Sequence, residues 1–374
     1  MSTHSKIMDE KYTYLVATRC FTYNHAPYIL DTLQGFAMQQ TAFPVVSVIV
    51  DDASTDGEAT ILHNWAKENI ALEEEGFAYR RDMEYGELFF ARHKDNANAH
   101  FAILLLKENH TQSKRTAQRY SYTLPWIENA TYFALCEGDD YWTDPFKLQK
   151  QVDYMQQHPQ CGLCITDFRY QNGTNPHLSS AAFSEKKELR PATLREHLFN
   201  ASYIGPMTWL FRQDIYNQGM ANSKPRSDGT FAIALDFFAI SEVCYLDDVT
   251  AVYRAHEKSA SNQSGHKARF NYCKGIFNTQ IEYAQKYCND DTTLTQLKTQ
   301  GYTTYMLDAI EAEDTEFIQE ALDFYHSIGL EMKWFVTKCE KYANYRKKYK
   351  KIYTSKAYRI GKQLLKPYKL IKKS

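Results

Sequence analysis

Apolar runs and periodic apolar positions alternate over the first 70 residues in the order strand, helix, strand, helix. The apolar runs at 14–21 and 45–50 are too short for typical helices and predict buried strands. The segments 28–39 and 58–68 carry apolar side chains at helical spacing. This order is the opening of a parallel α/β sheet, in which ligands bind at the carboxyl ends of the strands. We therefore expect the polar clusters that end both strands to lie at a binding site.

The most informative stretch is 132–142, where a short apolar run meets a cluster of carboxylates. Residues 132–136 predict a buried strand, and Glu137, Asp139 and Asp140 follow it within four positions. Gly138 between them allows the backbone to turn where a bulkier residue would not fit. Clustered carboxylates repel one another, and Mg²⁺ and Mn²⁺ favour oxygen ligands. The pattern thus favours a metal–phosphate site, with an acidic turn that caps the next helix as the alternative.

Other apolar runs extend the predicted sheet. They lie at 88–91, 162–168, 207–212, 245–246 and 249–253. The Asp-Pro pair at 144–145 predicts a helix start, because Asp is a good N-cap and Pro suits the first turn. Residues 101–107 fit either a helix or a strand, and 171–190 predict an exposed loop. The polar, basic segment 109–120 is either a loop that covers an anionic substrate or an ordinary surface loop.

The C-terminal third differs from the rest in pattern and charge. Helical periodicity with many Tyr, Gln and Lys residues predicts a helical extension over 261–336 after an α/β domain over 1–260. From Lys338 onward the chain holds 14 Lys/Arg and one acidic residue, so the rest carries a net charge of about −14. The tail 337–374 therefore predicts a basic amphipathic helix on an anionic membrane surface, or else a solvated end.

Composition limits the class of protein. The 374 residues are 44% apolar, which is enough for a large core. No apolar run reaches the ~18 residues of a spanning helix, and the first 11 residues lack the apolar centre of a signal peptide. Eight scattered cysteines are typical of free thiols in a reducing compartment. We expect a cytoplasmic protein that reaches the inner face of the plasma membrane through its tail, without a nucleic-acid partner.

Three blocks between residues 12 and 260 resemble the inverting family 2 of glycosyltransferases. They are Thr-Tyr-Asn-His at 22–25 with 48–56, Glu-Gly-Asp-Asp-Tyr-Trp-Thr-Asp-Pro at 137–145, and Tyr-Arg-Ala-His at 253–256. The second block resembles the metal motif of a branch that builds bacterial cell-surface polysaccharide, such as lipopolysaccharide or capsule. The resemblance implies a GT-A fold, a nucleotide-sugar donor, a divalent metal (Mn²⁺ or Mg²⁺) and a glycan or glycolipid acceptor. The basic tail favours a lipid-linked acceptor.

The first block implies the nucleotide pocket. By this resemblance Thr22, Tyr23 and Asn24 line that pocket, and Asp52 accepts a hydrogen bond from the base or positions the ribose. Turn chemistry and helix capping are the alternative roles for an Asp at such a position.

The other two blocks imply the metal site. Asp139 matches the last Asp of the family's Asp-x-Asp and is the principal metal ligand. Glu137 stands where the family has its first Asp, and Asp140 assists the metal or faces the donor sugar. His256 is a metal ligand, a contact of the diphosphate or a structural residue.

A glycosyl transfer also needs a carboxylate base, because the acceptor hydroxyl loses a proton as it attacks. In the family this base precedes a helix upstream of the last block. Asp228 fits that place, although its spacing to Tyr245 is slightly long, and Asp236 inside the helical stretch is the second candidate.

Two other classes of protein remain as alternatives. A nucleotidyltransferase needs a Gly-rich basic loop after the first strand, but residues 22–27 contain neither Gly nor Lys. A non-catalytic nucleotide- or glycan-binding module tolerates loss of the carboxylates, yet all of them are present. The helical extension either forms an oligomer or binds the acceptor.

Overall fold

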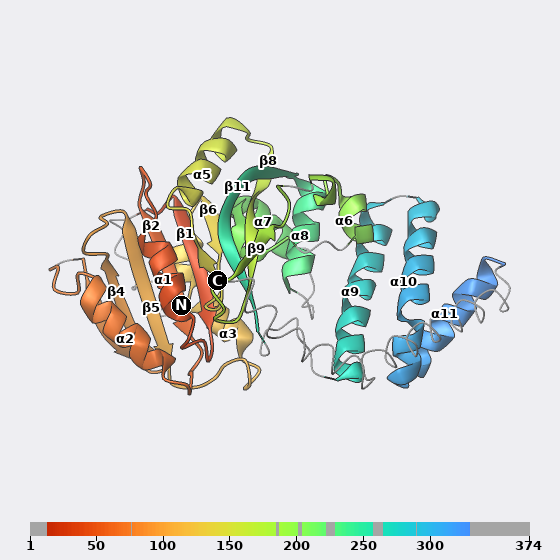
Figure 1. The fold of residues 1–374 in the computed structure, drawn as a ribbon, viewed down its shortest axis with the longest axis horizontal. Helices are drawn as coiled ribbons and strands as arrows, with labels where there is room; N and C mark the ends of the chain where they lie inside the picture. The colour runs from red at the N-terminus through yellow and green to blue at the C-terminus, as the bar shows by residue number, and fades with distance from the viewer. Residues whose placement is uncertain are drawn as a thin grey trace, which may run out of the picture. The chain divides into compact units, whose positions relative to one another are not determined.

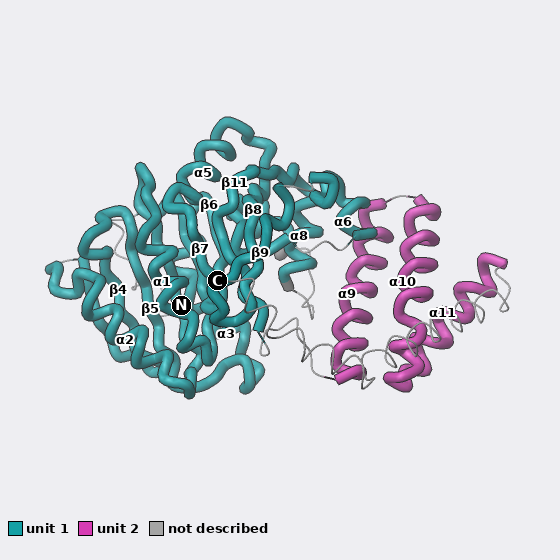
Figure 2. The backbone as a smooth tube through the Cα atoms, in the orientation of Figure 1, with its two compact units in different colours: residues 1–262 teal, residues 263–374 magenta. Residues whose placement is uncertain are grey.

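The computed structural model describes residues 13–75, 77–184, 187–200, 204–221, 229–256, 265–288 and 290–329. The chain divides into two compact units, residues 1–262 and 263–374 (Figure 2). Two earlier predictions lie outside the described residues, namely Asp228 and the basic tail 337–374. The same holds for the end of the predicted helical extension, from 330 to 336. None of the described helices combines the length and hydropathy that crossing a membrane requires.

Unit 1 is built on one mixed sheet, which has eleven strands within the described residues (Figure 1). The strand order is β3-β4-β5-β2-β1-β6-β10-β8-β11-β7, and β9 pairs with β8. The central neighbours β5, β2, β1 and β6 run parallel, as the strand–helix alternation predicts. The strands are β1 Val16–Thr22, β2 Val45–Asp51, β3 Tyr79–Met83, β4 Gly86–Arg92, β5 Ala99–Leu106, β6 Tyr132–Leu135, β7 Tyr141–Trp142, β8 Cys161–Asn172, β9 Leu178–Ala181, β10 Trp209–Arg212 and β11 Glu242–Ala255.

Several helices of unit 1 bury apolar side chains against this sheet or against one another. In α1 the predicted apolar positions Ile29, Leu33 and Phe36 are all buried. The helices are α1 Ile29–Ala37, α2 Glu58–Asn69, α3 Thr116–Ser121, α4 Leu124–Ile127, α5 Lys147–Gln157, α6 Leu194–Asn200, α7 Gln213–Ala221 and α8 Gly229–Ile240. Short 3-10 helices span Lys187–Leu189 and Pro206–Thr208.

The structure decides one open prediction and corrects three others. Residues 101–107 are extended within β5. The predicted exposed loop 171–190 is wrong in part, because β8 reaches Asn172 and half-exposed β9 pairs with it. The two predicted strands after 244 are one strand, β11, whose register shifts mark the polar interruption between Tyr245 and Val249. Asp144 is not the N-cap of α5, which begins at Lys147.

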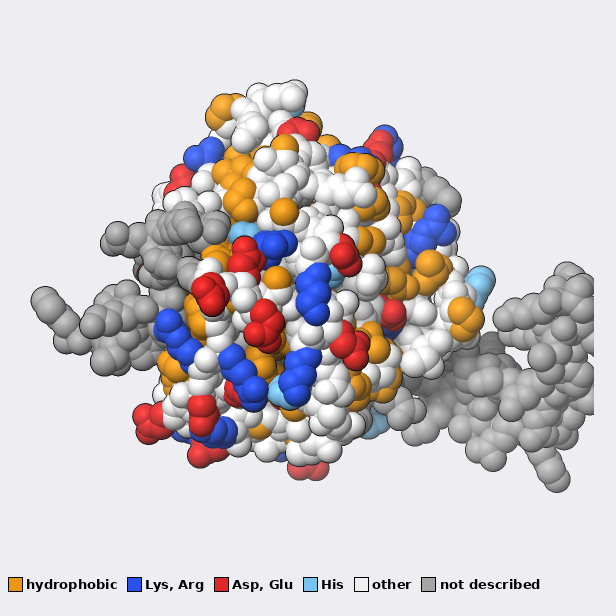
Figure 3. Space-filling model, turned by 90° about the vertical axis from the view of Figure 1, so that its left-hand side faces the viewer, with side chains coloured by type: hydrophobic (Ala, Val, Ile, Leu, Met, Phe, Trp, Pro, Cys, Tyr) orange, Lys and Arg blue, Asp and Glu red, His pale blue; other side chains and the backbone are white. Residues whose placement is uncertain are grey.

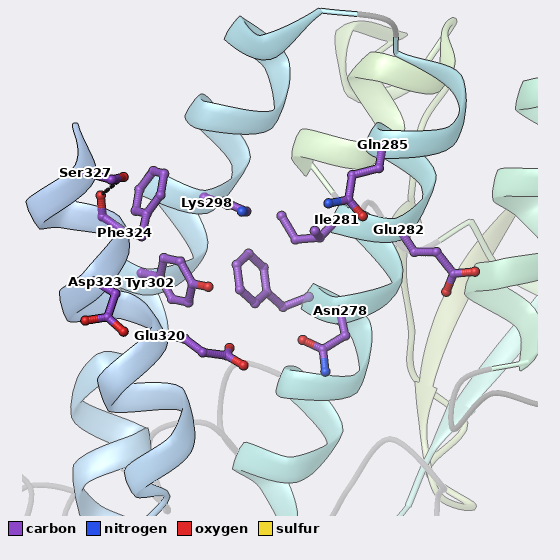
Figure 4. Close-up of a pocket in the computed structure, with 11 residues that line it drawn as sticks. Asn278, Ile281, Glu282, Gln285, Lys298, Tyr302, Glu320, Asp323, Phe324 and Ser327 are labelled. Carbon is purple, nitrogen blue, oxygen red and sulfur yellow. Dashed lines mark hydrogen bonds between the residues drawn. The ribbon is translucent and has the colours of Figure 1, made fainter.

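Unit 2 consists, in its described part, of the helices α9 His266–Tyr287, α10 Asp291–Glu311 and α11 Thr315–Ser327. Asp290 and Asp314 cap α10 and α11, accepting hydrogen bonds from Thr293 N (2.6 Å) and Phe317 N (2.9 Å). A cavity of about 660 Å³ opens between the three helices, and Figure 4 shows Lys298, Tyr302 and Phe324 among its lining side chains.

The outer face of unit 1 on the β4 and α2 side carries acidic and basic side chains interspersed (Figure 3). The described residues of unit 1 include ion pairs such as Arg92 with Glu74 (2.6 Å) and Lys107 with Asp82 (3.1 Å). Exposed pairs of this kind contribute little to stability, and mixed charge favours solubility.

The packing of α6 on α8 predicts a pH-dependent stability. His197 of α6 is buried against Phe231 and Phe238, and neither ring nitrogen has a hydrogen-bond partner among the described residues. Burial lowers the pKa of His197 from its ordinary 6.5 to about 4. Since the unfolded chain binds this proton at higher pH than the folded protein, the free energy of unfolding falls as the pH drops from 6.5 towards 4.

At pH 5 this loss amounts to about 2 kcal/mol. We expect His197→Phe to remove it, so that urea unfolding at pH 7 and pH 5 gives a smaller difference for the variant than for the wild type. An equal pH dependence in both proteins would contradict this account of α6.

Candidate functional site

Three loops meet at the carboxyl ends of the parallel strands β1, β2 and β6. Asp52 N donates to Thr22 O (2.9 Å), and Gly138 N donates to Phe21 O (3.2 Å), so the backbone itself joins the three loops. Asn24 and Ala53, in the loops after β1 and β2, have φ of 58° and 60°. Non-glycine residues in this left-handed region are strained, and such strain gathers at ligand sites. The loops therefore meet where the rule for α/β sheets places a ligand.

Two histidines and one carboxylate face one another in this place. His256 Nε2 lies 3.0 Å from Asp139 Oδ2, and His25 Nε2 lies 3.9 Å from the same oxygen. The three ligand atoms lie within 4.8 Å of one another, and each side chain is less than a fifth exposed. Burial alone would raise the pKa of Asp139, but the hydrogen bond with His256 and the charge of His25 hold that pKa below its usual value. Two imidazole nitrogens and an ionised carboxylate form a donor set that suits a divalent transition metal.

The neighbours of Asp139 in sequence point elsewhere. Glu137 Oε2 accepts a hydrogen bond from Phe21 N (2.8 Å), and burial raises the pKa of its carboxyl. Asp140 Oδ1 accepts from Arg254 N (2.8 Å), and burial together with the charge of Asp139 raises its pKa well above the usual range. In the described part of the chain, the group of potential metal ligands therefore includes Asp139 but neither neighbour.

Asp52 is fully buried and holds the basic segment 109–120 against the strand ends. Its carboxylate accepts from His110 N (2.6 Å), from Thr111 N (3.1 Å) and Oγ1 (2.6 Å), and from Arg119 Nη1 (3.0 Å). Burial alone would raise the pKa of Asp52, but the hydrogen bonds from Thr111 and His110 and the charge of Arg119 hold it below its usual value. The segment 109–120 is therefore anchored beside the site, and the predicted contact of Asp52 with the nucleotide stays a prediction.

Two side chains of the first block form hydrogen bonds with the loop after β2 and with the segment 109–120. Asn24 Oδ1 accepts from Thr55 N (2.8 Å), and the Tyr23 hydroxyl accepts from Gln112 Nε2 (3.2 Å). Tyr23 thus connects the loop after β1 to the segment 109–120. The role of Thr22, Tyr23 and Asn24 in the nucleotide pocket stays a prediction.

Arg254 lies inside the last of the three motif blocks, but the sequence analysis assigned it no role. It is buried and donates from Nη1 to Asp139 O (3.2 Å) and from Nε to Gln171 Oε1 (3.1 Å). Its guanidinium also pairs with Asp31 and lies 4.3 Å from the ring centre of Tyr141. It therefore fixes the acidic turn to the end of β11, which places His256 next to Asp139.

Asp236 lies buried in α8, where α8 packs on α7. A Cβ added at Gly219 of α7 would come within 2.9 Å of Asp236 Cβ, so the two helices approach closely there. The choice between Asp228 and Asp236 as a catalytic base stays open, because Asp228 lies outside the described residues.

Comparison with known proteins supports the fold. No family model matches the chain. Two uncharacterised mycobacterial proteins, Rv1520 of Mycobacterium tuberculosis and Mb1547 of Mycobacterium bovis, are 30% identical over 246 residues, which is 63% of this chain and 57% of each relative. The chain thus spans little more than half the length of these relatives.

Among solved structures, S. aureus TarS 1–349 in complex with UDP matches with a TM-score of 0.50 at 12% identity, over 88% of this chain and 91% of that one. The same protein in complex with UDP-GlcNAc matches with a TM-score of 0.50 at 14% identity, over 86% and 87%. The predicted fold class, an α/β domain of the GT-A type followed by a helical region, is confirmed.

The contacts of Asp52 predict what its loss would do. Asp52→Asn replaces one accepting oxygen with an NH₂ group, which donates hydrogens and cannot accept them. This group would face donors of the segment 109–120, so the segment loses its anchor. We expect amide hydrogen exchange over residues 110–119 to accelerate at least about tenfold, which corresponds to a loss of about 1.4 kcal/mol in local stability. Asp82→Asn, which alters an exposed pair with Lys107, is the matched control. Unchanged exchange in Asp52→Asn would contradict the anchoring role.

Proposed function

We propose that this protein is an inverting, metal-dependent glycosyltransferase that moves a sugar from a nucleotide-sugar to a cell-surface glycan. The observation that carries the proposal is the position of Asp139 beside His25 and His256 at the carboxyl ends of β1 and β6. The fold is shared with TarS, whose solved structures contain UDP and UDP-GlcNAc. These two facts support a nucleoside-diphosphate site built around Asp139.

The chemistry requires a charged leaving group to be stabilised. Breaking the sugar–phosphate bond leaves a nucleoside diphosphate, and a bound divalent metal neutralises the charge that develops on it. Asp139 and His256 would hold that metal, and the low pKa of Asp139 keeps its carboxylate ionised for the task. Thr22, Tyr23 and Asn24 would bind the nucleotide.

The acceptor side of the reaction needs a base. A carboxylate removes the proton of the acceptor hydroxyl as that oxygen attacks the sugar carbon, and Asp228 or Asp236 would take this role. Attack from the face opposite the leaving group inverts the configuration in a single displacement. The acceptor we propose is lipid-linked, and the basic tail 337–374 would hold the enzyme at the inner face of the plasma membrane.

A non-catalytic nucleotide- or glycan-binding module is the second candidate. It is favoured by one observation, namely that Glu137 and Asp140 use their carboxylates to bind backbone N–H groups of Phe21 and Arg254. Such a module would bind a donor without consuming it, so slow hydrolysis of the donor separates the two functions.

The function predicts metal-dependent binding that needs Asp139. A panel of nucleotide-sugars is titrated by calorimetry with and without Mn²⁺, and hydrolysis is followed in parallel. We expect one donor to bind with a Kd at least about tenfold lower when Mn²⁺ is present, and we expect both this gain and the hydrolysis to disappear in Asp139→Asn.

Asp153→Asn on the exposed side of α5 is the matched control, since its carboxylate bonds only Gln149 among the contacts described. If no donor binds, or if the Kd of the donor changes neither with Mn²⁺ nor in Asp139→Asn, the proposed function is wrong. Binding of a donor without its hydrolysis would favour the non-catalytic binding module.

A further inference from the structure

The imidazole of His25 is held by a chain of hydrogen bonds that begins at Glu58. Glu58, at the start of α2, is fully buried and accepts a hydrogen bond from the hydroxyl of Thr22. The same hydroxyl oxygen lies 3.2 Å from His25 Nδ1. The second carboxylate oxygen of Glu58 accepts from His25 N (2.8 Å) and from Ser54 Oγ (2.9 Å). Glu58 therefore fixes both the backbone and, through Thr22, the ring of His25.

The direction of these hydrogen bonds decides where His25 carries its proton. A carboxylate can only accept, so the Thr22 hydroxyl gives its one hydrogen to Glu58. The hydroxyl oxygen can then only accept from His25, which places a hydrogen on Nδ1. In the neutral imidazole the lone pair is then on Nε2. This Nε2 faces Asp139 Oδ2 at 3.9 Å, so in the neutral imidazole the lone pair of Nε2 and the carboxylate oxygen are aimed at the same place.

The backbone leaves room for this arrangement. A Cβ added at Gly138 would lie 2.1 Å from Thr22 Oγ1 and 3.1 Å from His25 Nδ1. Any side chain at 138 would displace the hydroxyl that joins Glu58 to His25. Gly138 is therefore required at the point where the acidic turn, the loop after β1 and the hydrogen bonds from Glu58 to His25 meet.

We propose that His25 is a metal ligand whose orientation and tautomer are set by Thr22 and Glu58, and that the site consequently prefers Mn²⁺ to Mg²⁺. A bound divalent metal would accept the Nε2 lone pair of His25 and the carboxylate of Asp139 together, where a proton joins the two groups when His25 is charged. Imidazole nitrogen suits transition metals, whereas Mg²⁺ prefers oxygen ligands, so each imidazole in the set shifts the preference towards Mn²⁺. Thr22 and Glu58 are positioning residues of the kind that fix a ligating histidine through its other ring nitrogen. The inference rests on the metal dependence of the proposed function.

The test is Mn²⁺ binding by the full-length protein, read by pulsed electron paramagnetic resonance and by calorimetry. The resonance spectrum counts the imidazole nitrogens on the ion, and we expect two in the wild type and one in His25→Ala. We expect the Kd for Mn²⁺ to rise about 10- to 100-fold in His25→Ala and about tenfold in Thr22→Val, which removes the hydroxyl. The Kd for Mg²⁺ should change less than about twofold in both variants.

Thr22→Ser is the matched control, because it keeps the hydroxyl and should leave the Kd for Mn²⁺ within about twofold of the wild type. Thermal unfolding of every variant checks the fold. If Thr22→Val does not fold, His25→Ala still provides the test, because His25 is partly exposed. One imidazole in the wild type, or an unchanged Kd in His25→Ala or in folded Thr22→Val, would overturn the inference while leaving metal-dependent transfer intact. A wild type that binds its donor but no metal would overturn the inference together with the metal part of the proposed function.

Discussion

The site depends on buried carboxylates that hold backbone N–H groups of neighbouring loops. Asp52, Glu58 and Asp140 are buried and Glu137 is half-buried, and each accepts from a backbone nitrogen of a different part of the chain. Buried polar groups must find partners, so these contacts leave little choice of loop conformation.

The acidic residues of the site therefore have two different roles. Four carboxylates fix the loops after β1, β2 and β6 and the end of β11, while Asp139 joins the two histidines. Arg254 completes the frame, because its backbone N–H binds Asp140 and its side chain binds Asp139 O. A rigid frame of this kind keeps a binding site in one geometry before the ligand arrives.

Much of the fold could be predicted from the sequence, because periodicity reports which faces are buried. The alternation of apolar runs gave the parallel centre of the sheet and the faces of α1 and α2. The pattern failed where burial is partial. The hairpin strand β3 and the edge strand β9 are polar and half-exposed, and β11 carries a polar interruption that divides one strand into two apparent ones.

The candidate site was predictable in its location and less so in its detail. Motif blocks identified Asp139 and His256, which lie 3.0 Å apart although 117 residues separate them in sequence. Adjacency in sequence suggested that Glu137 and Asp140 share one site with Asp139, but neighbouring side chains at a turn point in different directions. Glu58 carried no signal except its place in the first turn of a helix, where a carboxylate is common. His25 lay inside a quoted motif without an assigned role.

The measurement that tests the central claim most directly is a crystal structure of the protein with Mn²⁺ and the nucleoside diphosphate of the donor that it binds, with data collected at the manganese absorption edge. The account predicts an anomalous peak bounded by Asp139 Oδ2, His25 Nε2 and His256 Nε2, with the diphosphate on its open side. A peak at Glu137 or Asp140, or a bound diphosphate with no manganese beside Asp139, would contradict it.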